Sequence, residues 1–117
     1  MTIIDFLKDA GCDVETAIKR CDDDEEFYLE LLESALEEGR YKKIQEQLSL
    51  RDWKGAFESC HALKGVVSNL SLTPLTELAV ELTEKLRPQK ECDCTELVSK
   101  LLNTRKMLAE AFYRKKS

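Results

Sequence analysis

The sequence contains few of the residues that interrupt helices, with four glycines and two prolines in 117 residues. No stretch alternates apolar and polar residues over the length of a β-strand. Most long segments instead carry apolar residues at steps of three and four, which is the period of an amphipathic helix. The sequence therefore predicts an all-α protein.

Clustered positive charge is also scarce. The formal net charge is −5 and the isoelectric point is near 5.0, and the longest run of consecutive basic residues is the short tail at 114–116. Nucleic acids and anionic membranes need grouped Lys and Arg, so we expect neither as a partner. The chain also lacks an apolar run of bilayer-spanning length and a secretory signal pattern, so we expect a cytoplasmic location.

Several kinds of chemistry have no residues to support them. The sequence has a single histidine and no glycine-rich phosphate loop, which argues against most metal hydrolases and against a P-loop nucleotide site. The five cysteines form an odd set without repeated spacing, so we expect reduced thiols rather than a disulfide framework. Cys92 and Cys94 do not have the usual spacing of zinc ligands. We expect no metal and no cofactor bound by this chain.

The apolar pattern divides the chain into helices. We expect two short helices within about residues 2–21, then longer helices at about 24–49, 53–70, 74–87 and 94–114. Four long amphipathic segments with short connections predict an antiparallel up-down four-helix bundle preceded by two short N-terminal helices, all in one domain. Near Gly39 the pattern fits either one bent helix or two helices.

Residue types at the predicted helix ends support this division. The expected N-caps are Thr2, Asp13, Asp52 and Thr73, and Pro74 would take the first helical position. The residues expected to face inward in the first long segment are Phe27, Leu31, Leu32, Ala35 and Leu36.

The segment 53–70 carries His61, with Lys64 three residues later and Gly65 four residues later. Glycine inside a helix costs about 0.5–1 kcal/mol relative to alanine, so Gly65 calls for an explanation. On a helical projection, the apolar residues of this segment share one sector. His61, Gly65 and Ser68 lie on its flank with Lys54 and Glu58, so we expect His61 to be exposed.

These three residue types suit attack on phosphorus. A neutral imidazole is a nucleophile, and a lysine one turn away supplies positive charge for phosphoryl oxygens. A glycine on the same face would let a partner's phosphoryl group approach the imidazole. From spacing alone, however, an incidental surface histidine is the more common explanation of such a residue.

The motif His61-Ala62-Leu63-Lys64-Gly65 resembles the His-x-Leu-Lys-Gly signature of histidine-containing phosphotransfer (HPt) domains. The resemblance extends over nearly the whole chain, through upstream aromatic residues, downstream leucines and an acidic entry segment: Trp53, Phe57, Leu70, Leu75 and residues 13–28. The chain departs from the family where Val66 and Val67 replace small residues and where Ser71-Leu72 replaces a frequent Gly-Ala.

The resemblance implies an antiparallel four-helix bundle in which His61 accepts a phosphoryl group, through Nε2, with Lys64 assisting and Gly65 clearing access. It implies a phosphorelay carrier without kinase activity. Its partners would be response-regulator receiver domains, which bring Mg²⁺, and a hybrid sensor histidine kinase. The absence of a receiver or kinase segment leads us to expect a free-standing module.

The expected docking surface comprises the His61 flank and an exposed stripe on the next helix, formed by Val80, Thr83 and Arg87. Glu58 is a candidate to accept a hydrogen bond from Nδ1 of His61. We expect a monomer, although Val80 could face either a receiver or a second copy of the chain. The alternative function is a helical adaptor that binds a receiver or another partner without phosphotransfer.

Overall fold

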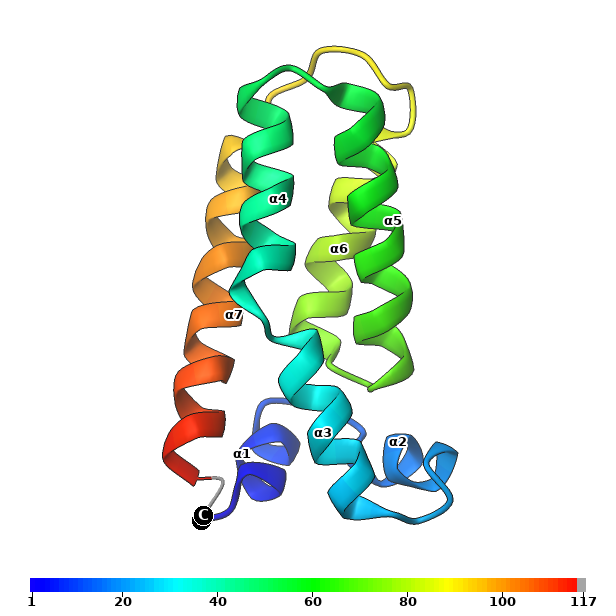
Figure 1. Cartoon of the computed structure of the whole chain (residues 1–117), viewed down its shortest axis with the longest axis vertical. Helices are drawn as coiled ribbons and strands as arrows, with labels where there is room; N and C mark the ends of the chain where they lie inside the picture. The colour runs from blue at the N-terminus through cyan, green and yellow to red at the C-terminus, as the bar shows by residue number, and fades with distance from the viewer. Residues whose placement is uncertain (116–117) are drawn as a thin grey trace.

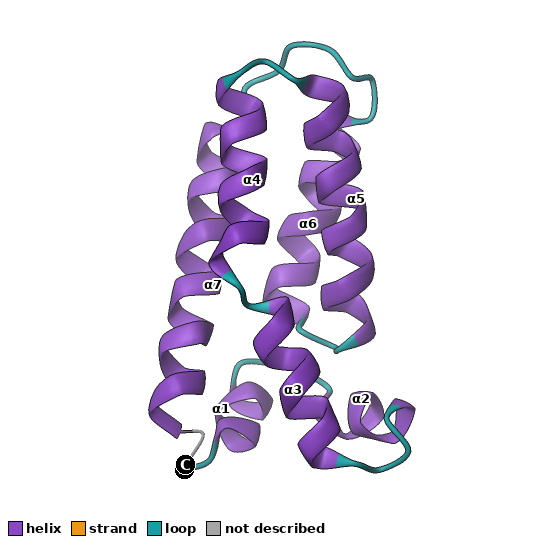
Figure 2. Ribbon diagram, viewed as in Figure 1, coloured by secondary structure: helices purple, strands orange, loops and turns teal. Residues whose placement is uncertain are grey.

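The computed structural model describes residues 1–115 and contains only helices and their connections in that range (Figures 1 and 2). The helices are α1 (Ile3–Asp9), α2 (Val14–Arg20), α3 (Glu25–Ala35), α4 (Glu38–Ser49), α5 (Trp53–Asn69), α6 (Thr73–Leu86) and α7 (Thr95–Lys115). The all-α prediction is confirmed, and the segments expected at 53–70, 74–87 and 94–114 correspond to α5, α6 and α7.

Helices α4, α5, α6 and α7 form the bundle and run alternately up and down (Figure 1). Each packs against the next in the chain, and α4 also contacts α7, which closes the ring. The molecule is elongated along the bundle axis, at 42 × 25 × 20 Å. In the described residues, every helix is too short or too polar to cross a bilayer.

The short helices α1 and α2 lie with α3 at one end of the bundle (Figure 1). Thr2 and Asp5 form a reciprocal capping box at the start of α1, and Asp13 caps α2. Helix α1 packs against α7, and α2 packs against α3. Neither short helix would be stable alone in water, so their order depends on this packing.

The segment expected at 24–49 is two helices, and the break lies at residues 36–37, just before Gly39. The last carbonyl groups of a helix lack intrahelical partners. Here side chains supply them: the Tyr41 hydroxyl donates to the Ala35 carbonyl at 2.7 Å, Arg40 Nε donates to the Ser34 carbonyl at 2.9 Å, and Arg105 Nε donates to the Leu36 carbonyl at 2.8 Å. The carbonyl groups of Ser34, Ala35 and Leu36 at the break are therefore all hydrogen-bonded.

Two local predictions were wrong. Phe27 is 46 % exposed, and Tyr28 takes the buried position instead, with its hydroxyl donating to the Leu70 carbonyl at 3.0 Å. Thr73 is the first residue of α6 rather than its N-cap, which is Leu72. The N-cap of α5 is Asp52, as expected.

Candidate functional site

Helix α5 forms because its apolar residues recur on one side and because Asp52 caps its start. The carboxylate of Asp52 accepts a hydrogen bond from the Gly55 backbone N–H at 2.9 Å. The buried side chains of the helix are Ala56, Cys60, Leu63 and Val67. The opposite flank is exposed to solvent and carries His61, as the sequence predicts.

The imidazole of His61 lies against Phe57, one turn earlier in α5. The two rings are stacked, with centroids 6.0 Å apart and an interplanar angle of 22°. The guanidinium of Arg87, the residue that follows α6, lies 5.5 Å from the centroid of the Phe57 ring. Arg87 is held by two hydrogen bonds to the Glu84 carboxylate, at 3.0 and 2.8 Å. His61 is thus connected to α6 through one aromatic ring.

Lys64 is partly buried on the same flank, which suits a lysine whose stem covers apolar surface while its ammonium stays in water. The pKa of Glu84 is lowered, first by its hydrogen bond with Arg87 and to a smaller extent by the positive charge of Lys64. Lys64 and Arg87 are therefore both within electrostatic reach of this one carboxylate. Lys64, Arg87 and Glu84 thus add charges of both signs to those of Lys54 and Glu58 on the exposed flank of α5.

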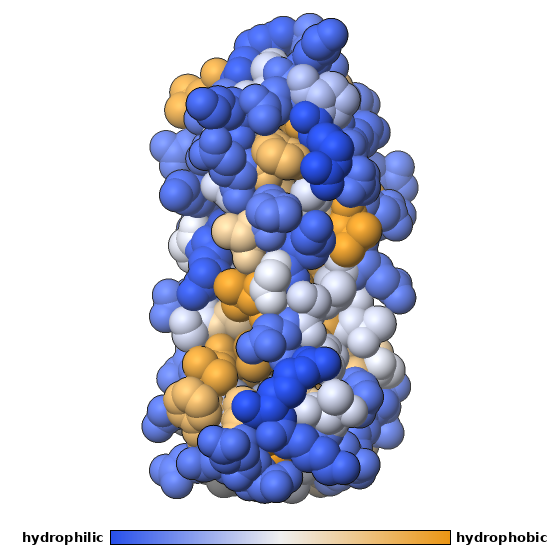
Figure 3. Space-filling view, turned by 90° about the vertical axis from the view of Figure 1, so that its right-hand side faces the viewer, coloured by the Kyte–Doolittle hydropathy of each residue, from blue (hydrophilic) through white to orange (hydrophobic). Residues whose placement is uncertain are grey.

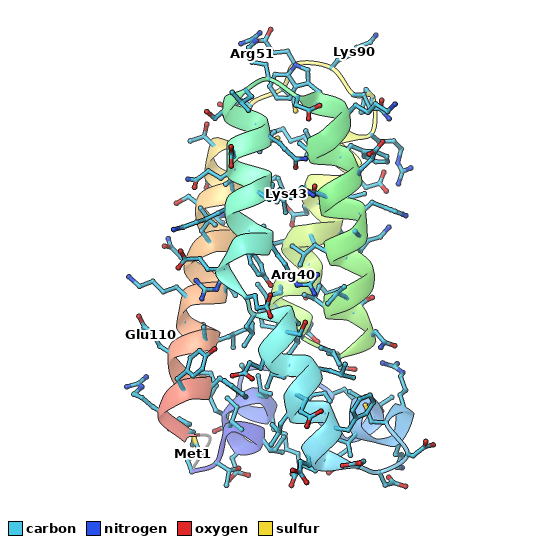
Figure 4. The ribbon with its side chains drawn as sticks, viewed as in Figure 1. Met1, Arg40, Lys43, Arg51, Lys90 and Glu110 are labelled. Atoms are coloured by element: carbon cyan, nitrogen blue, oxygen red, sulfur yellow. The ribbon has the colours of Figure 1, made fainter. Side chains whose placement is uncertain are left out.

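Gly65 is exposed, and a Cβ atom built there would meet no heavy atom within 4 Å apart from its neighbours along the helix. Internal packing therefore does not explain the glycine. The residue borders a shallow hollow between α5 and the α3–α4 junction, lined by Leu31, Ser34, Arg40, Ala62, Gly65, Val66, Asn69 and Leu70. Arg40 lies between α4 and α5 in the stick view (Figure 4).

Most residues of the expected docking surface are exposed, namely Lys54, Glu58, Ser68, Val80 and Arg87. Thr83 is not: it is completely buried, and its hydroxyl donates to the Ala79 carbonyl at 2.7 Å. A threonine can enter the core in this way because its own helix satisfies the hydroxyl. Glu84 takes its place beside Arg87 on the exposed side of α6.

One detail of the His61 environment differs from expectation. In the described part of the chain, no hydrogen bond joins Glu58 to His61, and Phe57 is the neighbour that contacts the imidazole. The Ser68 hydroxyl donates to the Gly65 carbonyl at 3.3 Å, within the helix. The sequence feature that could have identified Phe57 as this neighbour is its spacing of four residues from His61, which places both side chains on adjoining parts of the helix surface.

The face that presents α5 and α6 is mostly hydrophilic, with small hydrophobic areas between the polar side chains (Figure 3). Among residues 1–115, no group of three or more His, Cys, Asp and Glu side chains comes together in a way that could hold a metal ion.

Comparison with protein-family models matches residues 23–111 to the Hpt domain. The match covers most of the chain and includes α3 to α6, most of α7, and the entire His61 motif. Neither the curated proteins nor the solved structures gave a match. The matched range and the helical bundle together show that this chain belongs to the Hpt domain family, whose members carry out histidine phosphotransfer in two-component phosphorelays.

Proposed function

We propose that this protein is a phosphorelay carrier that accepts a phosphoryl group on His61 from the aspartyl phosphate of a receiver domain and passes it to another receiver. The observation that carries the proposal is the joint position of His61, Lys64 and Gly65 on the exposed flank of α5. A nucleophile, a cation and an open approach are adjacent there. The protein would act in the cytoplasm, where such receivers are found.

The proposed chemistry is a reversible in-line transfer. The lone pair of His61 Nε2 attacks phosphorus, and the bond from phosphorus to the aspartate oxygen breaks. The aspartate leaves as a carboxylate, and Nδ1 keeps its proton during the attack. The receiver would bring Mg²⁺, which neutralises charge on the phosphoryl oxygens, and this chain would supply the nucleophile and the docking surface.

Neighbouring residues have distinct proposed roles. Phe57 limits the orientations of the imidazole through ring stacking. The Lys64 ammonium would reach phosphoryl oxygens as a point charge. Gly65 leaves space for the receiver because its face carries no side chain. The contact would be surrounded by Lys54, Glu58 and Ser68 on α5, by Val80 on α6, and by Arg87 directly after α6.

The test uses purified receiver domains from the same organism, each charged with labelled phosphate. We expect label to appear on this protein, to be labile in acid and stable in base, and to be absent from the His61→Gln variant. Binding of a receiver without transfer would instead favour the adaptor function. Failure of every receiver to transfer label would refute the carrier proposal.

The Lys64→Ala variant tests the proposed role of the Lys64 ammonium as a positive charge near the phosphoryl oxygens. A charge-assisted hydrogen bond contributes about 1.5–3 kcal/mol, so loss of the ammonium should slow transfer by roughly tenfold or more. The melting temperature should change little because Lys64 is only partly buried. A large drop in melting temperature with an unchanged transfer rate would make Lys64 a structural residue instead.

A further inference from the structure

The connection between α6 and α7 brings two thiols together. The sulfur atoms of Cys92 and Cys94 lie 3.3 Å apart, and both cysteines are free. In a helix, side chains two residues apart point in very different directions. Residues 91–94 are non-helical, and this backbone allows both sulfurs to lie on the same side of the chain.

The backbone around Cys92 and Cys94 is held in place by two side-chain contacts. The Asp93 carboxylate accepts a hydrogen bond from the Thr95 N–H at 3.0 Å, at the start of α7. Glu91 forms an ion pair with Arg51 at 2.6 Å, which links this connection to the one between α4 and α5. Arg51 and Lys90 lie at the same end of the bundle (Figure 4).

The two thiols differ in accessibility. Cys92 is partly exposed, whereas Cys94 is 5 % exposed. Both line an open pocket of about 750 Å³ at the end of the bundle, together with residues of α4, α5 and α7. Burial raises the pKa of the Cys94 thiol to about 12, and its hydrogen bond with Cys92 adds to the effect. Burial therefore favours the neutral thiol at Cys94.

We infer that Cys92 and Cys94 form a reversible thiol–disulfide site that responds to peroxide. The Cys92 thiolate attacks a peroxide oxygen, which gives a sulfenic acid and hydroxide. The Cys94 sulfur then attacks the Cys92 sulfur, the S–S bond forms, and the sulfenic oxygen leaves as water. In balance, two thiols and one hydrogen peroxide give one disulfide and two waters.

The required movement is small. A disulfide bond is about 2.05 Å long, so the two sulfur atoms need to approach by about 1.2 Å from their separation of 3.3 Å. Closure of so short a loop removes little chain entropy, so the effect should be local. The site does not involve His61, so its failure would leave the proposed phosphotransfer function intact.

Peptide mass spectrometry tests the inference cleanly. Trypsin releases residues 91–100 as a peptide that contains Cys92 and Cys94 and no other cysteine, while Cys60 lies in a separate peptide, 55–64. The folded full chain is treated with hydrogen peroxide, unfolded, alkylated and digested. We expect the 91–100 peptide to lose two hydrogen atoms and to take up no alkylating reagent, and dithiothreitol should restore both thiols.

The controls separate this site from general oxidation. Cys60 is completely buried, so the 55–64 peptide should remain fully alkylated. In Cys94→Ser, a sulfenic acid should accumulate at Cys92 and react with dimedone. The inference is overturned if both thiols of the pair remain alkylatable, if Cys92 links two copies of the chain, or if Cys92 proceeds to sulfinic acid while Cys94 stays free.

Discussion

Replacing each of two glycines of α5 by alanine should change stability in opposite directions. Alanine is favoured over glycine in a helix interior by about 0.5–1 kcal/mol. At Gly65 the added Cβ meets open space, so Gly65→Ala should raise the free energy of unfolding by that amount. At Gly55 the added Cβ would overlap with Asp52 Oδ2.

The conflict at Gly55 involves the carboxylate that caps the helix. Asp52 must move to relieve it, and loss of an N-cap costs about 1 kcal/mol. This cost offsets the propensity gain, which is also smaller in the first turn. We therefore expect Gly55→Ala to be destabilising, with a difference of about 1–2 kcal/mol between the two variants.

The assay is thermal and urea unfolding followed by circular dichroism. A gain of 0.5–1 kcal/mol at Gly65 corresponds to a rise of roughly 2–6 °C in melting temperature for a domain of this size. A lower melting temperature for Gly65→Ala would show that the glycine is needed by the fold. The explanation of Gly65 as an access residue would then fail.

The same position links stability to transfer. Gly65→Leu should fold well, because its side chain projects from an exposed site, yet it should obstruct an approaching receiver and slow phosphotransfer more than Gly65→Ala does. A transfer rate in Gly65→Leu equal to that of the parent protein would remove the steric argument, whatever its melting temperature.

Three further expectations follow from individual contacts. Tyr28→Phe removes the buried hydroxyl that reaches the α5–α6 turn and should cost about 1–2 kcal/mol in urea unfolding; an unchanged midpoint would mean that the bond contributes nothing. Arg87→Ala removes the cation over Phe57, a contact worth about 0.5–1 kcal/mol. This variant should slow phosphotransfer by roughly two- to fivefold with little change in melting temperature. A large loss of stability would contradict this expectation. Hydrogen bonds from Thr16 lower the pKa of Asp13 below 3.8, so its stabilising effect is fully present above pH 3.8 and is lost as the pH falls through the lowered value. Asp13→Asn should therefore weaken the dependence of melting temperature on pH in this acid range, and an unchanged acid profile would contradict the assignment.

Sequence periodicity located the helices well because an amphipathic helix must bury its apolar face. It also located His61 on the exposed flank of α5, beside Gly65. Side-chain oxygen atoms predicted the starts of α1, α2 and α5, since Thr2, Asp13 and Asp52 each accept a hydrogen bond at the expected N-cap. These features depend on residues that are close together in the sequence.

The features that were missed depend on residues far apart or on polar side chains in the core. Tyr28 lies four and seven residues before Leu32 and Ala35, so its spacing fits the buried stripe, but the carbonyl that pairs with its buried hydroxyl lies 42 residues away. The end of α3 depends on Arg105, which lies 69 residues from Leu36. Thr83 enters the core because its own helix binds its hydroxyl, and a simple apolar count treats it as surface.

The turn between α5 and α6 is held by donors from the N-terminal part of the chain. Arg20 donates to the Asn69 carbonyl at 2.8 Å, and Tyr28 donates to the adjacent Leu70 carbonyl. The family match begins at residue 23, which lies between these two donors in the sequence. The matched family unit therefore leaves out one of the two side-chain donors that hold this turn. A fragment beginning at residue 23 would keep the recognisable motif while leaving the end of its histidine helix with one donor in place of two.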